Sequence, residues 1–198
     1  EGLPVFLHNG VNIAVEPSNS LACSTCHTDV RGDFNVYEVN EVSMPSGARV
    51  SFGEADPNNM CLNCHQGRES TVSVNRAITN AGVGDDEVSD TLNFRNPHYF
   101  AAGATLFGAE AMGAYQFEGM DYNGRNYHAR NMETCTDCHN PHMLEVEYDL
   151  CTECHENVES PEDIFLIRLE EDEDVDPVDY DGDGQVTEPI RDEIATLH

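Results

Sequence analysis

Apolar residues occur along this chain in short groups that turn-forming residues separate. The 198 residues include 15 Gly and 9 Pro, and stretches rich in Asn, Ser and Asp divide the apolar groups. This pattern predicts loops and short helices over most of the first 160 residues. No run of about 18 apolar residues occurs, so the sequence predicts no membrane-spanning helix. The expected fold class is mostly irregular coil with short α-helices and a few short strands.

A few segments carry clearer signals. We expect short helices over residues 66–79 and 85–94, and Val50 with Phe52 indicates a short strand. Residues 100–117 form the longest weakly polar stretch and are rich in Gly and Ala. Such a stretch suits either a tight contact with another subunit or a cover over a bound group.

Residues 161–198 are predicted to form a separate acidic tail. Ser160 can cap a helix over residues 161–171, because Pro161 suits the first helical position and the acids that follow favour the positive end of the helix dipole. A second, amphipathic helix is expected where three apolar residues share one face, Ile190, Ile194 and Leu197. The chain thus divides into a domain of residues 1–160 and a helix–loop–helix tail.

The charge of the chain excludes one class of partner. There are 38 acidic and 9 basic residues, which gives a formal net charge of −29, and all nine basic residues are Arg. Nucleic-acid binding requires clustered Lys and Arg, and the potential of this surface repels a polyanion. A cationic or metallic partner fits the composition better.

Eight cysteines form four pairs with identical spacing, and a histidine follows each pair directly. The four Cys-x-x-Cys-His groups are Cys23, Cys26 and His27; Cys61, Cys64 and His65; Cys135, Cys138 and His139; and Cys151, Cys154 and His155. This is the attachment motif of c-type haem. Two thiols three positions apart on a helical turn can reach the two vinyl groups of a porphyrin, and the next histidine can bind the iron.

Zinc sites built from cysteines and disulfide bonds are the two alternatives for paired cysteines. Neither requires a histidine after every second cysteine. The sequence therefore predicts four covalently attached haems c, around which the loops and short helices pack. Because His139 and Cys151 are close in sequence, the last two haems are expected to be close neighbours.

Five further histidines can supply the sixth ligand of four irons: His8, His98, His128, His142 and His198. This supply exceeds the demand, so we expect bis-histidine ligation and no methionine ligand, which would raise the reduction potential. His142 lies three residues after His139, so the two cannot bind one iron from opposite faces. We expect His142 to bind a different haem, with Pro141 stiffening the link.

The other distal candidates differ in their local context. His98 follows a proline and His128 follows a turn-like Asn-Gly pair, so both are expected to be ligands carried on loops. His8 and His198 lie near the ends of the sequence. We favour His8, because the apolar residues 5–7 precede it, and such a ligand can serve its own haem or one in a neighbouring copy.

The acidic tail also matches the first nine positions of a calcium loop, with Asp at positions 1, 3 and 5, Gly at 6 and a backbone carbonyl at 7. The candidate Ca²⁺ ligands are Asp179, Asp181, Asp183, Gln185 and Glu188. Position 12 is Ile190, where the pattern requires a bidentate Glu. Glu188, Asp192 or Glu193 would have to supply the missing oxygens. A solvated acidic hinge without metal is the alternative.

The four motifs, the Cys-x-x-Cys-His-Asn-Pro-His element and the Asp-Gly-Asp-Gly tail resemble the multihaem c-type cytochromes. More closely, they are similar to the OmcE-like extracellular tetrahaem cytochromes that polymerise into nanowires. The resemblance covers residues 23–155. It implies little regular secondary structure, a continuous haem stack, bis-histidine irons, and a histidine near one subunit's N-terminus that completes a haem in the next subunit. His8 matches that role, and the additional His198 departs from the pattern.

Iron with two imidazole ligands has no open site, so we predict an electron-transfer protein and not an enzyme. Three hypotheses follow. The first is a subunit of an extracellular or cell-surface filament, which is exported and assembles head to tail with copies of itself, because contacts that do not close generate polymers. The second is a monomeric periplasmic electron shuttle. The third is a multihaem reductase, which requires a five-coordinate haem. Each hypothesis includes redox partners or electron acceptors outside the chain.

Overall fold

The computed structural model describes residues 21–84, 86–97, 101–128, 132–155, 157–168 and 178–196. The chain divides into two compact units, Glu1–Glu133 (unit 1) and Thr134–His198 (unit 2). The division falls before the third haem motif, whereas the sequence pattern placed a boundary after residue 160. Each unit therefore contains two of the four motifs. No helix within the described residues is long and apolar enough to cross a membrane.

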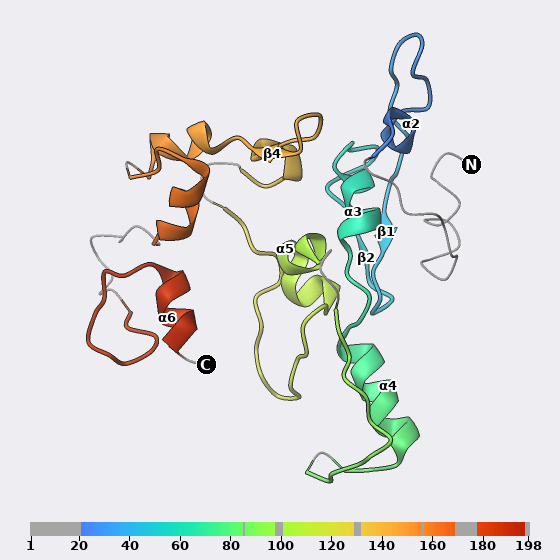
Figure 1. The fold of residues 1–198 in the computed structure, drawn as a ribbon. Helices are drawn as coiled ribbons and strands as arrows, with labels where there is room; N and C mark the ends of the chain where they lie inside the picture. Colours follow the sequence, from blue (N-terminus) through green and yellow to red (C-terminus); the bar gives the residue numbers. More distant parts are fainter. Residues whose placement is uncertain are drawn as a thin grey trace. The chain divides into compact units, whose positions relative to one another are not determined.

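Unit 1 contains short helices and one two-stranded sheet, joined by irregular segments (Figure 1). Its described elements are α2 (Cys23–Cys26), β1 (Val42–Ser43), β2 (Arg49–Val50), α3 (Asn59–His65), α4 (Thr71–Ala81) and α5 (Ala102–Ala111). β1 and β2 pair in antiparallel fashion, with Val42 opposite Val50. The strand expected at Val50 and Phe52 forms, but it ends at Val50.

Unit 2 is built from shorter elements. They are η1 (Cys135–Asp137), β3 (His139–Asn140), β4 (Glu145–Val146), η2 (Tyr148–Glu153), η3 (Pro161–Leu166) and α6 (Ile190–Thr196), where η marks a 3₁₀-helix. β3 and β4 form a hairpin in which His139 lies opposite Val146. Most described residues of both units lie outside helices and strands. That these segments pack around haems stays a prediction.

Helix α4 lies close to the position that the sequence predicted for it. A helix was expected over residues 66–79. The helix begins later than expected, at Thr71, because Gly67 has a φ of 73°, which is not a helical conformation. Ser70 and Ser73 form a capping box at its N-terminus. The helix ends at Ala81, and Gly82 after it adopts the left-handed conformation that glycine tolerates best.

Two other helix predictions need correction. Residues 86–94 form no helix, because side chains such as Ser89 compete for local hydrogen bonds, and Val88 and Phe94 are almost fully exposed. The segment starting at Pro161 is a 3₁₀-helix that ends at Leu166 and does not extend to residue 171 as expected. A helix forms at the predicted position near residue 190 as α6, but the expected apolar face is not its buried side: Ile194 is 53% exposed, whereas Glu193 is fully buried. Leu197 lies outside the described residues.

The hydrophobic core of unit 1 is small and joins the sheet to α3 and α5. Its buried members are Val42, Met44, Val50, Leu62, Ala104, Phe107 and Ala111. Phe107 packs edge-on against Phe52, with ring centroids 5.2 Å apart. The guanidinium of Arg125 lies over both rings, at 4.6 and 4.7 Å from their centroids. Such cation–π contacts are worth about 0.5–2 kcal/mol each.

Three residues of the weakly polar stretch 100–117 belong to this core, Ala104, Phe107 and Ala111, and all three lie on α5. α5 packs against α3, and Gly103 permits the close approach, because a Cβ there would lie 2.7 Å from Leu62 Cδ2 and 2.8 Å from the carbonyl oxygen of His65. The buried face of α5 is thus occupied inside unit 1. Both predicted roles of the stretch, a contact with another subunit and a cover over a bound group, stay predictions.

Unit 2 has much less side-chain core. Among its described residues, Val158 is the one fully buried hydrophobic residue. Met143, Leu144, Phe165 and Leu166 are each more than half exposed. Apolar burial of this extent supplies little of the free energy that offsets chain ordering.

The contact at Gly103 makes a stability prediction. Gly103→Leu should lower the free energy of unfolding of unit 1 by about 2 kcal/mol, because the new side chain overlaps Leu62 and the His65 backbone. Ala102→Leu, at an exposed position of the same helix, should change it by less than about 0.5 kcal/mol. Thermal unfolding followed by circular dichroism measures both. Equal stability of the two variants would contradict the packing of α5 on α3.

Candidate haem-attachment sites

Each Cys-x-x-Cys segment forms one helical turn. In the first motif the amide of His27 donates to the carbonyl of Cys23 at 2.9 Å. The second motif lies entirely within α3. No disulfide bond joins any of the eight cysteines, all of which lie within the described residues. In this geometry both sulfurs of a motif lie on one side of a turn, which is what two thioether bonds to one porphyrin edge require.

The two motifs of unit 2 form their turns as 3₁₀-helices. The amide of Cys138 donates to the carbonyl of Cys135 at 3.3 Å, and the amide of His155 donates to the carbonyl of Cys151 at 2.8 Å. In the third motif Thr134 and Asp137 form a capping box that fixes the start of the turn. The same local geometry therefore recurs in all four motifs, although the surrounding structure differs.

The first two motifs lie close together in unit 1. Burial raises the pKa of the Cys26 thiol, and electrostatic interaction with Cys61 raises it further. The pKa of Cys64 is raised by burial first, and then by Cys26 and Cys61. Interactions of this kind need short separations, so the thiols of α2 and α3 face a common region. Nothing in the sequence spacing of these motifs predicted that proximity.

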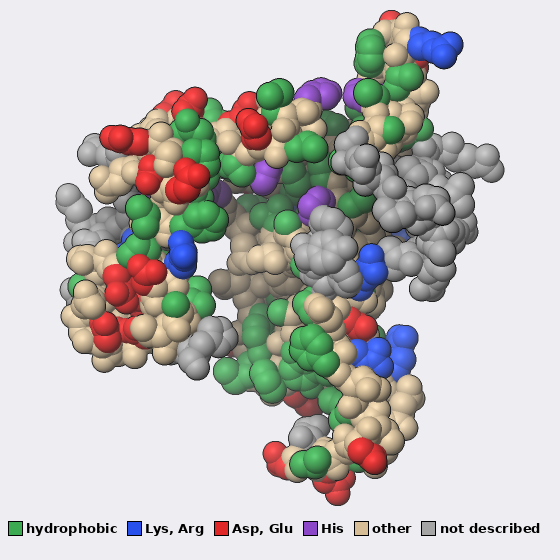
Figure 2. Space-filling model, in the orientation of Figure 1, with side chains coloured by type: hydrophobic (Ala, Val, Ile, Leu, Met, Phe, Trp, Pro, Cys, Tyr) green, Lys and Arg blue, Asp and Glu red, His purple; other side chains and the backbone are tan. Residues whose placement is uncertain are grey.

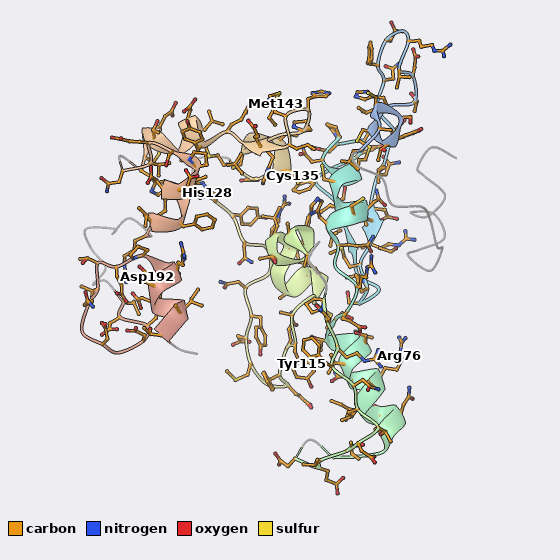
Figure 3. The ribbon with its side chains drawn as sticks, viewed as in Figure 1. Arg76, Tyr115, His128, Cys135, Met143 and Asp192 are labelled. Atoms are coloured by element: carbon orange, nitrogen blue, oxygen red, sulfur yellow. The ribbon has the colours of Figure 1, made fainter. Side chains whose placement is uncertain are left out.

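The third and fourth motifs are paired in the same way within unit 2. The pKa of the Cys138 thiol is raised by burial, by Cys151 and by Asp137, in that order. Here the short link between the motifs had predicted the closeness. In Figure 3 Cys135 is labelled at the start of η1, and Met143 in the turn between β3 and β4.

The four proximal histidines have different surroundings. His27 and His155 are partly buried, whereas His65 and His139 are exposed. In the space-filling view, histidine side chains (purple) reach the surface of the molecule (Figure 2). The Nδ1 atom of His27 makes a hydrogen bond of 2.6 Å with the backbone carbonyl of Phe34. When Nδ1 makes a hydrogen bond, Nε2 is the ring nitrogen that can coordinate a metal ion.

Two distal candidates lie within the described residues, and both are exposed. His142 follows Asn140, whose side-chain oxygen accepts hydrogen bonds of 3.1 Å from the amides of His142 and Met143. These bonds form a tight turn directly after His139 on β3. That His142 and His139 bind two different irons stays a prediction. His128 lies in an irregular segment of unit 1. His8, His98 and His198 lie outside the described residues.

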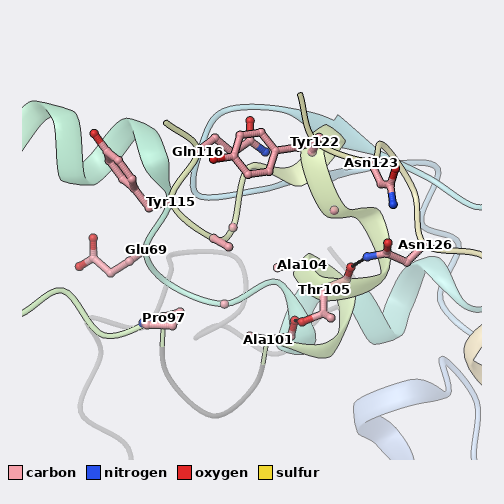
Figure 4. A pocket seen from close by; sticks show the side chains of 15 residues that line it. Glu69, Pro97, Ala101, Ala104, Thr105, Tyr115, Gln116, Tyr122, Asn123 and Asn126 are labelled. Carbon is pink, nitrogen blue, oxygen red and sulfur yellow. Dashed lines mark hydrogen bonds between the residues drawn. The ribbon is translucent and has the colours of Figure 1, made fainter. Parts of the chain in front are cut away.

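A cavity of about 360 Å³ in unit 1 was not anticipated (Figure 4). Mostly small side chains of α5 and of the segment after it line this cavity, and Asn126 Nδ2 donates to the carbonyl of Thr105 at 2.7 Å across one wall. Its lining includes Gly67 and Pro97, close in sequence to His65 and His98, and one carboxylate, Glu69.

The acidic loop of unit 2 is organised by its own carboxylates. Asp179 accepts hydrogen bonds from the amides of Gly182 and Gly184 at 2.7 and 2.9 Å. Asp181 and Asp183 accept similar bonds from amides two residues further along the chain. Hydrogen bonds lower the pKa of Asp181, first from the Thr196 hydroxyl and then from the Asp183 amide.

Two overlapping groups of carboxylates converge in this loop, Asp179, Asp181 and Glu193 in one and Asp181, Asp183 and Glu188 in the other. Within each group the oxygens lie within 4.8 Å of one another. Glu193 is not one of the five primary candidates, but it was one of the residues expected to supply the missing oxygens. Helix α6 brings it back, fully buried, where it pairs with Arg168 and accepts from the Tyr180 amide.

The donor set of the four motifs fits haem c. Each site offers two thiols on one turn and an adjacent imidazole, and the side-chain core is small enough to leave packing to a large apolar group. Haem would supply reversible one-electron chemistry at its iron. The protein would contribute attachment, axial nitrogen and surroundings.

No protein-family model matches the chain, and no solved structure matches it. Among curated proteins, the chain is similar to "C-type polyheme cytochrome OmcB" of Geobacter sulfurreducens, in strains DL-1/KN400 and ATCC 51573/PCA. The identity is 33% over 100 residues, which cover 44% of this chain and 12% of each relative. The similarity supports the general class of multihaem c-type cytochrome, with haem c as cofactor and electron transfer as the role.

The attachment sites make a direct prediction of haem content. The native chain should carry four haems, and the double variant Cys61→Ala, Cys64→Ala should carry three, because one porphyrin loses both thioether bonds. The conservative change Met60→Leu, next to the same motif, should keep four. Absorbance of the pyridine haemochrome against protein concentration gives the ratio. A native ratio other than four would contradict the assignment.

Proposed function

We propose that this protein is a tetrahaem c-type cytochrome that relays electrons along a closely spaced chain of bis-histidine haems. The observation that carries the proposal is the set of four Cys-x-x-Cys-His turns, two in each unit. Within each unit the turns are near enough for Cys61 to raise the pKa of Cys26 and for Cys151 to raise the pKa of Cys138, after burial in both cases. Haems bound at paired turns would be neighbours, which is the arrangement that rapid electron exchange requires.

Bis-histidine ligation follows from the supply of histidines. Four proximal and five further histidines serve four irons, so every iron can be six-coordinate. Such irons would exchange electrons without binding a substrate. Their potentials would lie below those of irons with a methionine ligand. A multihaem reductase would instead need one five-coordinate haem.

We further propose that copies of the chain assemble head to tail into an extracellular or cell-surface filament. The support is the resemblance to the nanowire-forming cytochromes and the position of His8, which matches the histidine that completes a haem in the next subunit. A monomeric periplasmic shuttle is the second candidate, in which all distal ligands come from one chain. The net charge of −29 favours cationic or metallic partners over polyanionic ones.

Electron microscopy of negatively stained native material separates these two functions. Filaments of uniform width are expected for the native chain. His8→Ala should abolish them and convert about one haem in four to a high-spin state, because an iron at each junction loses its second imidazole. His198→Ala is the matched control and should leave filaments and spin state unchanged.

The alternative outcomes are equally definite. Compact particles from the native chain, with only low-spin iron, would favour the shuttle. Loss of filaments in His198→Ala but not in His8→Ala would transfer the bridging role to His198. A high-spin fraction in native compact particles would favour the reductase.

The loop of residues 179–193 is proposed to bind Ca²⁺. The specific support is Glu188, whose Oε1 atom is buried and has no hydrogen-bond partner among the described residues. Burial raises the pKa of this carboxyl, and the neighbouring carboxylates of Asp183, Asp181, Glu193 and Asp192 raise it further. A divalent cation would remove this repulsion and satisfy the orphaned oxygen.

The calcium proposal predicts opposite effects of one substitution in two conditions. Without Ca²⁺, Glu188→Gln should stabilise unit 2 at pH 7, because a carboxyl with a raised pKa lowers the stability of the folded state when it ionises. For the same reason, the native metal-free unit should become more stable as the pH falls through the pKa of Glu188. With Ca²⁺ in about 100-fold excess over its Kd, the native chain should gain at least about 4 °C in Tm and the variant none.

Glu159→Gln, which changes an exposed carboxylate of the same unit, is the matched control and should behave as the native chain does. Calorimetric titration of the desalted protein with CaCl₂ measures binding directly. Absence of binding at millimolar Ca²⁺ would leave the loop as a solvated acidic hinge.

A further inference from the structure

The loop that follows the first haem motif folds back onto it. The amide of Thr28 donates to the carbonyl of Asn35 at 2.7 Å, and the amide of Tyr37 donates to the carbonyl of Cys26 at 3.0 Å. His27 and Val36 form an isolated antiparallel bridge between these bonds. Residues 28–37 (the return loop) are thus joined by backbone hydrogen bonds to the turn that carries the first motif.

Phe34 contacts His27 in two ways. Its carbonyl oxygen lies 2.6 Å from Nδ1 of His27, and its ring stands edge-on to the imidazole at a centroid distance of 5.9 Å and an angle of 90°. Phe34 has a φ of 54°, a conformation that bulky residues rarely adopt. A conformation of this cost persists only where the surrounding structure holds it.

Asp29 holds the return loop in shape. Its carboxylate accepts hydrogen bonds from the amides of Arg31 and Asp33, at 2.8 and 3.0 Å. These two bonds bridge the chain immediately before Phe34. Asp33 provides a useful contrast, because it carries the same charge in the same loop but its exposed side chain makes no hydrogen bond with the described residues.

We propose that the return loop is a positioning device for the first haem iron, in which the Phe34 carbonyl accepts the Nδ1 proton of His27 and Asp29 keeps that carbonyl in place. The inference rests on the proposed attachment of a haem at Cys23 and Cys26. The hydrogen bond selects the tautomer that presents Nε2 to the iron and fixes the orientation of the imidazole plane. It also makes the imidazole a stronger donor, which stabilises ferric iron and lowers the potential of this haem.

The test uses two substitutions of Phe34 that differ in backbone conformation. Phe34→Asn removes the ring but keeps the carbonyl in place, because Asn tolerates a positive φ. Phe34→Pro fixes φ near −65° and withdraws the carbonyl from His27. Asp29→Ala and Asp33→Ala form a second, milder pair. Each removes one negative charge from the exposed return loop, but Asp29→Ala also removes the hydrogen bonds from the amides of Arg31 and Asp33.

The readouts are redox titration of the individual haems by NMR and exchange of the imidazole Nδ1 proton. Signals of the first haem are those missing from the variant Cys23→Ala, Cys26→Ala. Phe34→Pro should raise the midpoint potential of this haem alone and speed Nδ1 proton exchange about tenfold, as for the loss of one hydrogen bond. Phe34→Asn should leave both unchanged, and Asp29→Ala should raise the potential more than Asp33→Ala does.

An unchanged potential and unchanged exchange in Phe34→Pro would overturn the inference. If that variant does not fold, equal shifts in Asp29→Ala and Asp33→Ala would overturn it, because charge alone would then account for them. Failure of the underlying function is seen separately. A native chain without a haem at Cys23 and Cys26 would refute the attachment, whatever the loop variants show.

Discussion

The constraint on which this structure depends is that two sulfurs and one imidazole must lie on a single turn of backbone. Five residues and a local hydrogen bond satisfy it, so each site is almost independent of its surroundings. The α-helical turns of unit 1 and the 3₁₀-helices of unit 2 meet it equally well. A chain with this freedom can dispense with large sheets and long helices. Little regular structure goes with little side-chain core here. The core of unit 1 is small, and the described part of unit 2 buries a single hydrophobic residue, Val158.

The chain has nine basic residues, all Arg, against 38 acidic ones, and two of these arginines each make several contacts inside the fold. Arg125 stacks over Phe52 and Phe107 and donates to the carbonyl of Glu133. Arg168 pairs with Glu193 and donates to the carbonyls of Glu188 and Val178. The planar guanidinium suits both roles, because it stacks on rings and directs several donors at once. In a chain of net charge −29, these arginines act within the fold as connectors between backbone segments.

Spacing in the sequence was sufficient to predict the attachment turns, because their geometry is local. A helix was likewise expected within a few positions of α4, although the capping box of Ser70 and Ser73 that sets its start was not identified from the sequence. Prediction failed where distant segments decide the outcome. Residues 86–94 form no helix, and the apolar side chains of Val88 and Phe94 stay exposed. The role of the Phe34 carbonyl has no signature in the sequence, since every residue carries a backbone carbonyl. The sequence offered Glu188, Asp192 and Glu193 as equal alternatives at the acidic loop, because only the fold of α6 decides which of these carboxylates meet Asp179 and Asp181.

The packing of α5 on α3 bears on the order in which the molecule is made. The turn that presents Cys61 and Cys64 needs only neighbouring residues, whereas the cover over it comes from a later part of the chain, at Gly103 and Phe107. Local structure forms before contacts that close long loops. The turn of α3 can therefore form before α5 does, and the contact of Gly103 with Leu62 and His65 closes only when the later segment packs. Folding of this unit would then proceed from the attachment turn outward.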